Sequence, residues 1–262
     1  MVPVVILSVL VLPPVYLALL VALIAAVGSW EMLRTTQVPH DRLIYWLTAL
    51  TAAAIPLGHW LGKGSLVFYI ALLALMLALF FQAITRYNRE EPVDVGHLMV
   101  AAFAGVILPS MLSALVQLKG MENGHFLAML PVISAFLTDV CAYFVGMFLG
   151  KHRGITRVSP KKSLEGYIGG IVCGSLLMIL YGLALGYWFH LEVNLPVMAL
   201  YGLVGSAVTE LGDLAFSLIK RQYGVKDYGT LFPGHGGMYD RFDSISFAAP
   251  TMLVLVQLLP AF

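Results

Sequence analysis

Two acidic residues stand within one helical turn of each other inside an apolar stretch of the chain. The segment 195–219 carries Glu210 and Asp213, and a second apolar segment, 126–149, carries Asp139. An ionised carboxylate in hydrocarbon is costly, so such residues usually face a polar cavity and mark a functional site. Two neighbouring carboxylates need a cation, and a divalent metal is the obvious one. Hydrogen bonding between helices is the alternative, but it does not need two negative charges together.

The polar residues around this pair are spaced as one face of a helix. Their separations of four, three, four and three residues match the helical repeat. They are Ser206, Glu210, Asp213, Ser217 and Lys220. In 126–149, Asp139, Tyr143 and Gly146 share a face in the same way. It stays open whether Ser206 and Ser217 only join helices by hydrogen bonds.

A second group of reactive residue types follows in the stretch 217–243. Four basic residues stand among three acidic ones, and glycines surround a single histidine in 233–237. Glycines let backbone N–H groups approach an anion closely. Lysine and arginine bind phosphate oxygens, and carboxylates together with phosphates hold magnesium. The stretch therefore predicts a site for a metal and a polyphosphate, whereas an ordinary basic loop would explain only the lysines.

Apolar segments supply the elements that must position these residues. Hydrophobic residues make up 60% of the 262 residues and charged ones only 11%, against about 25% charged residues in a soluble domain. Since a span needs about 20 apolar residues, we expect an all-α, polytopic integral membrane protein with about eight or nine transmembrane helices. The candidate spans are 4–27, 43–61, 66–85, 98–118, 126–149, 167–189, 195–219 and 242–259. A ninth helix results if Pro13 and Pro14 split the first span.

Loops between these spans are short, so we expect one membrane domain over 1–262, with N-terminal helices in 1–125 and catalytic helices and loops in 126–262. With eight spans, 13 of the 15 lysines and arginines fall on one side, and Lys63 and Lys119 fall on the other. Lysine and arginine are retained on the cytoplasmic side, which places the loop 217–243 there. No basic tail or domain predicts a nucleic-acid partner. Cys141 and Cys173 lie in apolar stretches and predict neither a disulfide framework nor a metal site.

The stretch from Ser217 to Asp243 resembles the signature of the phosphatidate cytidylyltransferase, or CDP-diacylglycerol synthase, family. That signature runs Ser, Lys-Arg, Lys-Asp, Pro-Gly-His-Gly-Gly and Asp-Arg-x-Asp, and all of these positions are present. The block 159–166, the helix of Asp139 and the Gly-Asp pair at 212–213 also resemble family segments. The resemblance covers about the C-terminal half. The N-terminal half resembles the family only in hydropathy and in the pair Trp30–Glu31.

One position departs from the family pattern. Phe216 stands where many bacterial members carry a glutamate. Glu210 lies on the same helical face as Asp213 and is a candidate to supply the missing charge.

The resemblance implies an enzyme that joins CTP to phosphatidic acid at the bilayer, forming CDP-diacylglycerol and pyrophosphate with Mg²⁺. Nucleotidyl transfer mostly needs positioning and charge neutralisation. We expect catalytic roles for Asp213, Lys226, Asp227, His235, Asp240 and Arg241. We expect metal ligands among Asp213, Asp240, Asp243 and Asp139. We expect substrate binding by Lys161, Lys162, Ser163, Ser217, Lys220, Arg221, Gly234, Gly236 and Gly237.

Several alternatives stay open at this point. The block 161–163 could grip either CTP or the lipid phosphate, and His235 could donate a proton to pyrophosphate, bind phosphate or only shape the glycine turn. Whether a second cation binds and whether the protein forms a homodimer also stay open. The rival functions are another CTP-dependent enzyme of lipid phosphates, a lipid kinase that transfers the γ-phosphate, and a transporter, which would place its carboxylates near the bilayer midplane. We expect the enzyme in a bacterial cytoplasmic membrane, with its active site facing the cytoplasm.

Overall fold

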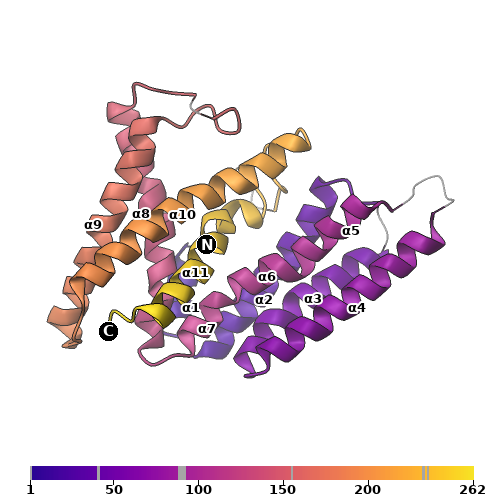
Figure 1. The fold of residues 1–262 in the computed structure, drawn as a ribbon, viewed down its shortest axis with the longest axis horizontal. Coiled ribbons are helices and arrows are strands. Elements are labelled where there is room, and N and C mark those ends of the chain that lie inside the picture. The colour runs from indigo at the N-terminus through magenta and orange to yellow at the C-terminus, as the bar shows by residue number, and fades with distance from the viewer. Residues whose placement is uncertain (1, 40–41, 88–92, 155, 232–233, 235) are drawn as a thin grey trace. The chain divides into compact units, whose positions relative to one another are not determined.

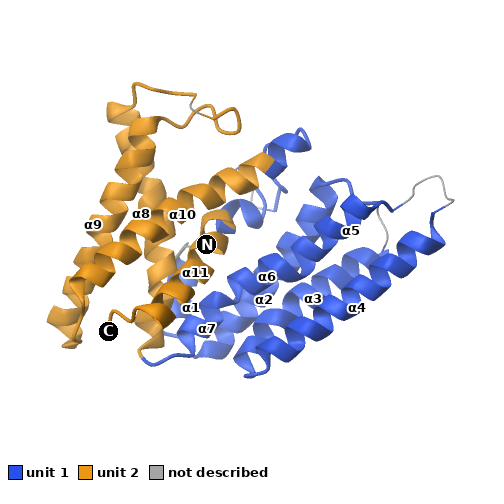
Figure 2. Cartoon of the chain, in the orientation of Figure 1, with its two compact units in different colours: residues 1–122, 219–242 blue, residues 123–218, 243–262 orange. Residues whose placement is uncertain are grey.

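The computed structural model describes residues 2–39, 42–87, 93–154, 156–231, 234 and 236–262, and it contains helices but no strand within those residues (Figure 1). The chain divides into two compact units (Figure 2). Unit 1 comprises residues 1–122 and 219–242, and unit 2 comprises residues 123–218 and 243–262. The boundary therefore falls inside two helices, and the stretch with the richest chemistry in the sequence belongs to the same unit as the N-terminal helices.

Unit 1 is built on apolar helices joined by short loops. They are α1 (Val2–Leu10), α2 (Pro14–Thr35), α3 (Arg42–Trp60), α4 (Gly64–Thr85), α5 (Val95–Ala102), η1 (Phe103–Ile107), α6 (Leu108–Leu112) and α7 (Ala114–Lys119). The break before α2 follows from Pro13 and Pro14, because proline lacks the N–H that would continue α1 and is well suited to the first turn of a new helix. The split at these prolines is confirmed, but only α2 is long enough to cross a membrane, so α1 does not add a ninth span.

The fourth predicted span is a broken helix rather than a regular one. One π-helical turn, η1, interrupts it just before Pro109. Proline removes an intrahelical hydrogen bond, and a π-turn is one way for a helix to absorb that loss. Within unit 1, α3 packs against α2, α4 and η1, and its buried Ile44, Tyr45 and Ile55 form the centre of an apolar core.

Unit 2 contains two complete long helices and most of two others. They are α8 (Gly124–Leu149), α9 (Leu164–Phe189), α10 (Leu195–Gln222, of which 195–218 lie in unit 2) and α11 (Tyr239–Leu258, of which 243–258 lie in unit 2). Helices α8 and α9 pack along each other (Figure 1). Glycines of α9 allow this close packing: an added Cβ at Gly169 would lie 2.5 Å from the Val145 side chain of α8.

Seven helical segments are long and apolar enough to cross a membrane among the residues that the structure describes. They correspond to seven of the eight predicted spans, with the first now at Pro14–Thr35. The eighth predicted span forms helix α11, whose first turns carry the charged residues Asp240, Arg241 and Asp243. The protein is therefore an all-α polytopic membrane protein, as the sequence predicted.

Candidate active site

Three of the predicted site residues meet in unit 2. Lys162, from the loop between α8 and α9, points its ammonium group at α10. The Nζ atom lies 2.5 Å from Oε2 of Glu210 and 2.7 Å from Oδ2 of Asp213. Asp139 of α8 also interacts electrostatically with these charges. We call Asp139, Lys162, Glu210 and Asp213 the carboxylate–lysine cluster.

The helix α10 brings the two carboxylates together because residues three apart share a helical face. Glu210 is completely buried, whereas a quarter of the Asp213 side chain is exposed. A buried carboxylate is tolerated only with a partner charge, and Lys162 provides it. Burial lowers the pKa of Lys162, but the adjacent Asp213 and Glu210 raise it by more, so the pKa lies above the usual lysine value. Lys162 is therefore a permanent cation at neutral pH.

The second oxygen of Glu210 is oriented toward α9. Oε1 is buried and has no hydrogen-bond partner within the part of the chain that the structure describes. An added Cβ at Gly170 would lie 3.2 Å from this oxygen, so glycine leaves the space open. A buried acceptor without a donor is unusual and has capacity for a cation or a water molecule.

Asp139 reaches the same region from α8. Its Oδ2 accepts a hydrogen bond of 3.3 Å from Ser244 Oγ of α11. Tyr143, one turn further along α8, is 66% exposed, and Gly146 packs against Ser163 and Gly166 at the start of α9. Of the three residues on the predicted face of α8, Asp139 thus belongs to the cluster, Gly146 packs against the start of α9, and Tyr143 is exposed.

Unit 1 contains a second group of predicted residues around Asp240. One carboxylate oxygen accepts from Lys220 Nζ at 2.7 Å, and the other accepts from the backbone N–H groups of Tyr228 and Gly237, both at 2.8 Å. Three donors leave little free capacity on a carboxylate. In this structure Asp240 ties the end of α10 to the glycine-rich loop 223–238.

Glu31 of α2 completes this group, and it was not among the predicted site residues. Its Oε2 accepts a hydrogen bond from the Met238 N–H. Any side chain at Gly229 or Gly237 would collide with the Glu31 carboxylate, so both positions must be small. The only sequence signal for Glu31 was its place in the Trp30–Glu31 pair.

The other predicted residues have varied surroundings. Ser163 is buried and its Oγ caps α9 by accepting from the Gly166 N–H, so its hydroxyl has a structural role. Ser217 and Gly237 are buried, and Asp243 accepts a hydrogen bond from the Ser244 N–H. The exposed ones are Lys161, Arg221, Lys226, Asp227, Gly234 and Arg241.

Gly234 and Gly236 have φ values of 75° and 80°, which glycine adopts without strain. His235 lies outside the described residues.

Within the described residues, no three His, Cys, Asp or Glu side chains are grouped so that they alone could hold a metal ion. Magnesium seldom has an all-protein cage and usually takes one or two carboxylates together with substrate phosphates. The carboxylate–lysine cluster fits that pattern, because Asp213 is partly exposed and Glu210 Oε1 is an unused acceptor. Asp240 fits less well, since its oxygens already accept three hydrogen bonds.

Comparison with known proteins decides the family. A family model described as the cytidylyltransferase family matches residues 1–259. The chain belongs to this family. Two relatives of this cytidylyltransferase, both named phosphatidate cytidylyltransferase, come from Staphylococcus haemolyticus and Staphylococcus epidermidis. They are 30% identical over 244 and 242 residues, covering 91% and 92% of this chain and 88% and 89% of the relatives. A Staphylococcus aureus protein of the same name is 38% identical over 135 residues, which is 52% of this chain and 50% of the relative.

The departure at position 216 has a structural explanation in this cytidylyltransferase. Phe216 is 1% exposed and its ring meets Phe247 edge to face, with 6.4 Å between the ring centroids. This position therefore faces apolar packing. Glu210 places its charge beside Asp213 instead; that it replaces the family glutamate functionally stays a prediction.

Proposed function

We propose that this protein is a phosphatidate cytidylyltransferase that makes CDP-diacylglycerol for phospholipid synthesis. The phosphate oxygen of phosphatidic acid attacks the α-phosphorus of CTP. The bond between the α-phosphorus and the oxygen bridging to the β-phosphate breaks, and pyrophosphate leaves. The observation that carries the proposal is the family match over residues 1–259, together with the relatives named phosphatidate cytidylyltransferase that cover about 90% of the chain.

The arrangement of charges supports this reaction. An intramembrane acidic cluster with one fixed cation, Lys162, suits a reaction between a lipid phosphate and a nucleotide at the membrane surface. Lys226 and Arg241 are exposed and free to approach a triphosphate, which lysine and arginine bind well. Asp240 fixes two points of the glycine-rich loop by accepting from the Tyr228 and Gly237 N–H groups, and glycine-rich backbone is suited to meet phosphate oxygens.

Magnesium is the cofactor that we propose, held by Asp213 with Asp139 or Glu210 and by the phosphates of CTP. A bound divalent ion would neutralise charge on the reacting phosphates. Asp243 remains a further candidate ligand.

We place the active site at the cytoplasmic face of a bacterial cytoplasmic membrane. The excess of lysine and arginine in the loops of one side supports this orientation, and the relatives named above are bacterial. A homodimer belongs to the same proposal, and light scattering of the protein in detergent distinguishes it from a monomer.

Product analysis tests the reaction. The purified protein is incubated with phosphatidic acid, magnesium and CTP labelled at either the α or the γ position. We expect α-label in the lipid and release of pyrophosphate. Transfer of γ-label would identify a lipid kinase instead. No transfer by demonstrably folded protein would contradict the enzyme proposal for this lipid and favour a transporter.

A further inference from the structure

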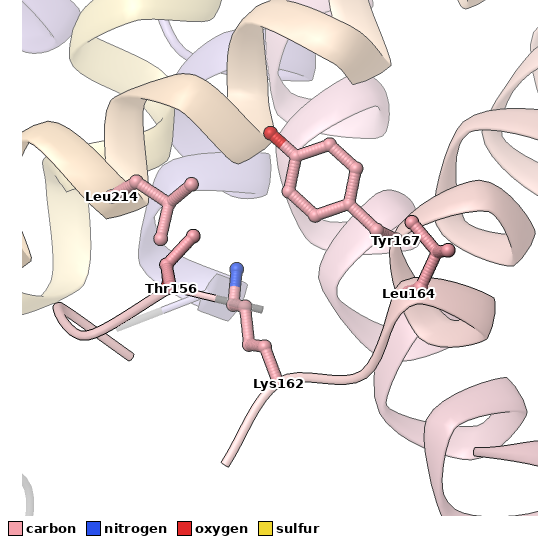
Figure 3. A pocket seen from close by; sticks show the side chains of 5 residues that line it. All are labelled: Thr156, Lys162, Leu164, Tyr167 and Leu214. Atoms are coloured by element: carbon pink, nitrogen blue, oxygen red, sulfur yellow. The ribbon is translucent and has the colours of Figure 1, made fainter. Parts of the chain in front are cut away.

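Unit 2 contains a cavity of about 220 Å³ beside the carboxylate–lysine cluster (Figure 3). Its lining comes from the loop after α8, from the first turn of α9 and from α10. The lining residues are Thr156, Lys162, Leu164, Tyr167 and Leu214. The aliphatic side chains of Leu164 and Leu214 and the ring of Tyr167 form most of the wall, and Lys162 is the one charged side chain among the described residues that line it (Figure 3).

Lys162 is held rigidly at this cavity. Its Nζ is bound by Glu210 and Asp213, at 2.5 and 2.7 Å. Glu210 is completely buried, so withdrawing Lys162 would leave an uncompensated charge inside the protein. Lys162 keeps 29% of its side chain exposed and is therefore a fixed cation that still has access to a ligand.

The apolar wall continues along α9. Leu164, Ile168, Val172, Leu176 and Leu180 follow at intervals of four residues, and each is between 44% and 57% exposed. Each residue of this row is a surface neighbour of the next, and because four residues slightly exceed one helical turn, the row winds gradually around α9. The stripe starts at the cavity and runs along a helix that is long and apolar enough to span the membrane.

A lipid phosphate fits a cavity with a fixed cation and an adjoining apolar helix surface better than a nucleotide does. The triphosphate of CTP carries several negative charges and needs several donors, whereas the described lining offers one cation and the hydroxyls of Thr156 and Tyr167. Its volume is also below the about 300–1,000 Å³ that drug-sized ligands occupy. A single phosphomonoester on an apolar tail matches one cation at the end of an apolar stripe.

We infer that this cavity is the phosphatidate subsite: Lys162 Nζ donates to the lipid phosphate, and one acyl chain lies along the α9 stripe. The inference rests on the proposed function and assigns the block 161–163 to the lipid rather than to CTP. It also names Leu214 and Leu164 as residues that determine the fit of the glycerol backbone.

The charge balance adds a condition. Glu210, Asp213 and Asp139 together outnumber Lys162, so the cluster by itself repels a lipid phosphate. Phosphatidate therefore binds well here only when a divalent cation is present.

A cavity-filling variant tests the assignment in nanodiscs of defined phosphatidate content. Leu214→Trp is the test variant. Leu203→Trp is the control, because Leu203 is 52% exposed on the same helix and does not line the cavity. We expect Leu214→Trp to raise the KM for phosphatidate about 10-fold with the KM for CTP changed less than about 2-fold, as loss of binding to one substrate requires. Leu203→Trp leaves both KM values unchanged. A raised KM for CTP alone, or no change in either, overturns the inference.

Photolabelling provides a readout that does not depend on turnover. A phosphatidate with a diazirine in one acyl chain is irradiated with the wild-type protein and magnesium, without CTP. We expect label in 164–180, competition by unlabelled phosphatidate but not by phosphatidylcholine, and loss of label with EDTA. Label elsewhere overturns the inference. If selective labelling occurs in protein that transfers no cytidylyl group, the subsite stands and the proposed function fails.

Discussion

Lys162 is the residue on which the intramembrane charges depend. It neutralises a fully buried glutamate and is shared with a partly exposed aspartate. Truncating one partner of a buried ion pair costs more than the pair contributes, because the other charge stays buried. Lys162 and Glu210 should therefore behave as one unit.

We predict that Lys162→Met lowers the free energy of unfolding by about 3–5 kcal/mol. The double variant Lys162→Met/Glu210→Gln should recover part of this loss, because it also removes the buried charge. SDS-induced unfolding of the single and double variants measures the coupling, which should exceed about 1 kcal/mol. Lys161→Met is the control, since Lys161 is exposed and should change little. If the unfolding free-energy changes of the two single variants add up to that of the double variant, the coupling is contradicted.

Asp240→Asn separates a positioning role from metal binding. The NH2 group of the new asparagine must face either the Lys220 ammonium or the two backbone N–H groups, and all of these are donors. We therefore expect the free energy of unfolding to fall by about 1–3 kcal/mol and hydrogen exchange in 223–238 to become faster. Activity should fall by about 100-fold, within the range for loss of a positioned group. The magnesium concentration for half-maximal rate should stay the same if Asp240 is not a ligand. A large increase would show that Asp240 binds the metal, as the sequence predicted. Asp227→Asn, at an exposed residue, is the control for the stability measurement.

At the residue scale, the sequence predicted which residues of one helix lie together better than it predicted which distant residues they contact. The helical spacing of Glu210, Asp213 and Lys220 was sufficient to place them on one face. The contact between Glu31 and Met238 joins residues 207 positions apart, and no local pattern encodes such a pairing. The capping role of Ser163 could have been recognised, because a serine before an apolar helix is a common N-cap.

At the scale of elements, glycines of α9 set how closely it approaches α10. A Cβ at Gly174 would collide with Ser206 Oγ and lie 2.7 Å from Thr138 Oγ1. Those two hydroxyls bond to each other at 2.8 Å. The hydrogen bond and the glycine thus form one packed contact among α8, α9 and α10.

We predict that Gly174→Ala destabilises the protein by about 1–3 kcal/mol, the usual cost of overpacking. Gly186→Ala is the matched control on the same helix, because its added Cβ would make only an ordinary contact of 3.5 Å with the Leu191 carbonyl oxygen. The control should be neutral or slightly stabilising, since alanine favours helix over glycine by about 1 kcal/mol. Thermal unfolding of both variants measures the difference. Equal effects would refute the close contact.

The number and order of long helices followed from hydropathy, but their irregularities did not. Seven spans were predictable because a run of about 20 apolar residues is typical of a transmembrane helix. The π-helical turn at Phe103–Ile107 depends on how the chain absorbs Pro109, which hydropathy does not report. The grouping of 219–242 with the N-terminal helices also depends on Glu31 and Thr35, whose bonds to the loop are long-range.

At the scale of the whole molecule, helix α11 decides on which side of the membrane the C-terminal segment lies. Its apolar part is shorter than that of the other spans, because charged residues occupy its first turns. Both of its ends are nevertheless fixed against α10 within unit 2. Near its start, the Asp243 carbonyl adjoins Gly212. Beyond its end, the Tyr201 hydroxyl donates to Leu259 O at 2.6 Å and the Asn194 N–H donates to Ala261 O at 2.8 Å.

These contacts predict that the C-terminal segment lies on the side opposite the active site. Residues 195 and 212 of α10 are separated by about 26 Å at 1.5 Å per residue, close to the about 30 Å of a bilayer core. Single cysteines replace Glu192, Pro260, Arg157 and Lys226 in a protein that lacks Cys141 and Cys173. An impermeant maleimide should label positions 192 and 260 in intact cells, and positions 157 and 226 only after permeabilisation. If position 260 is labelled together with position 157 instead, α11 does not cross the membrane and the protein has seven spans rather than eight.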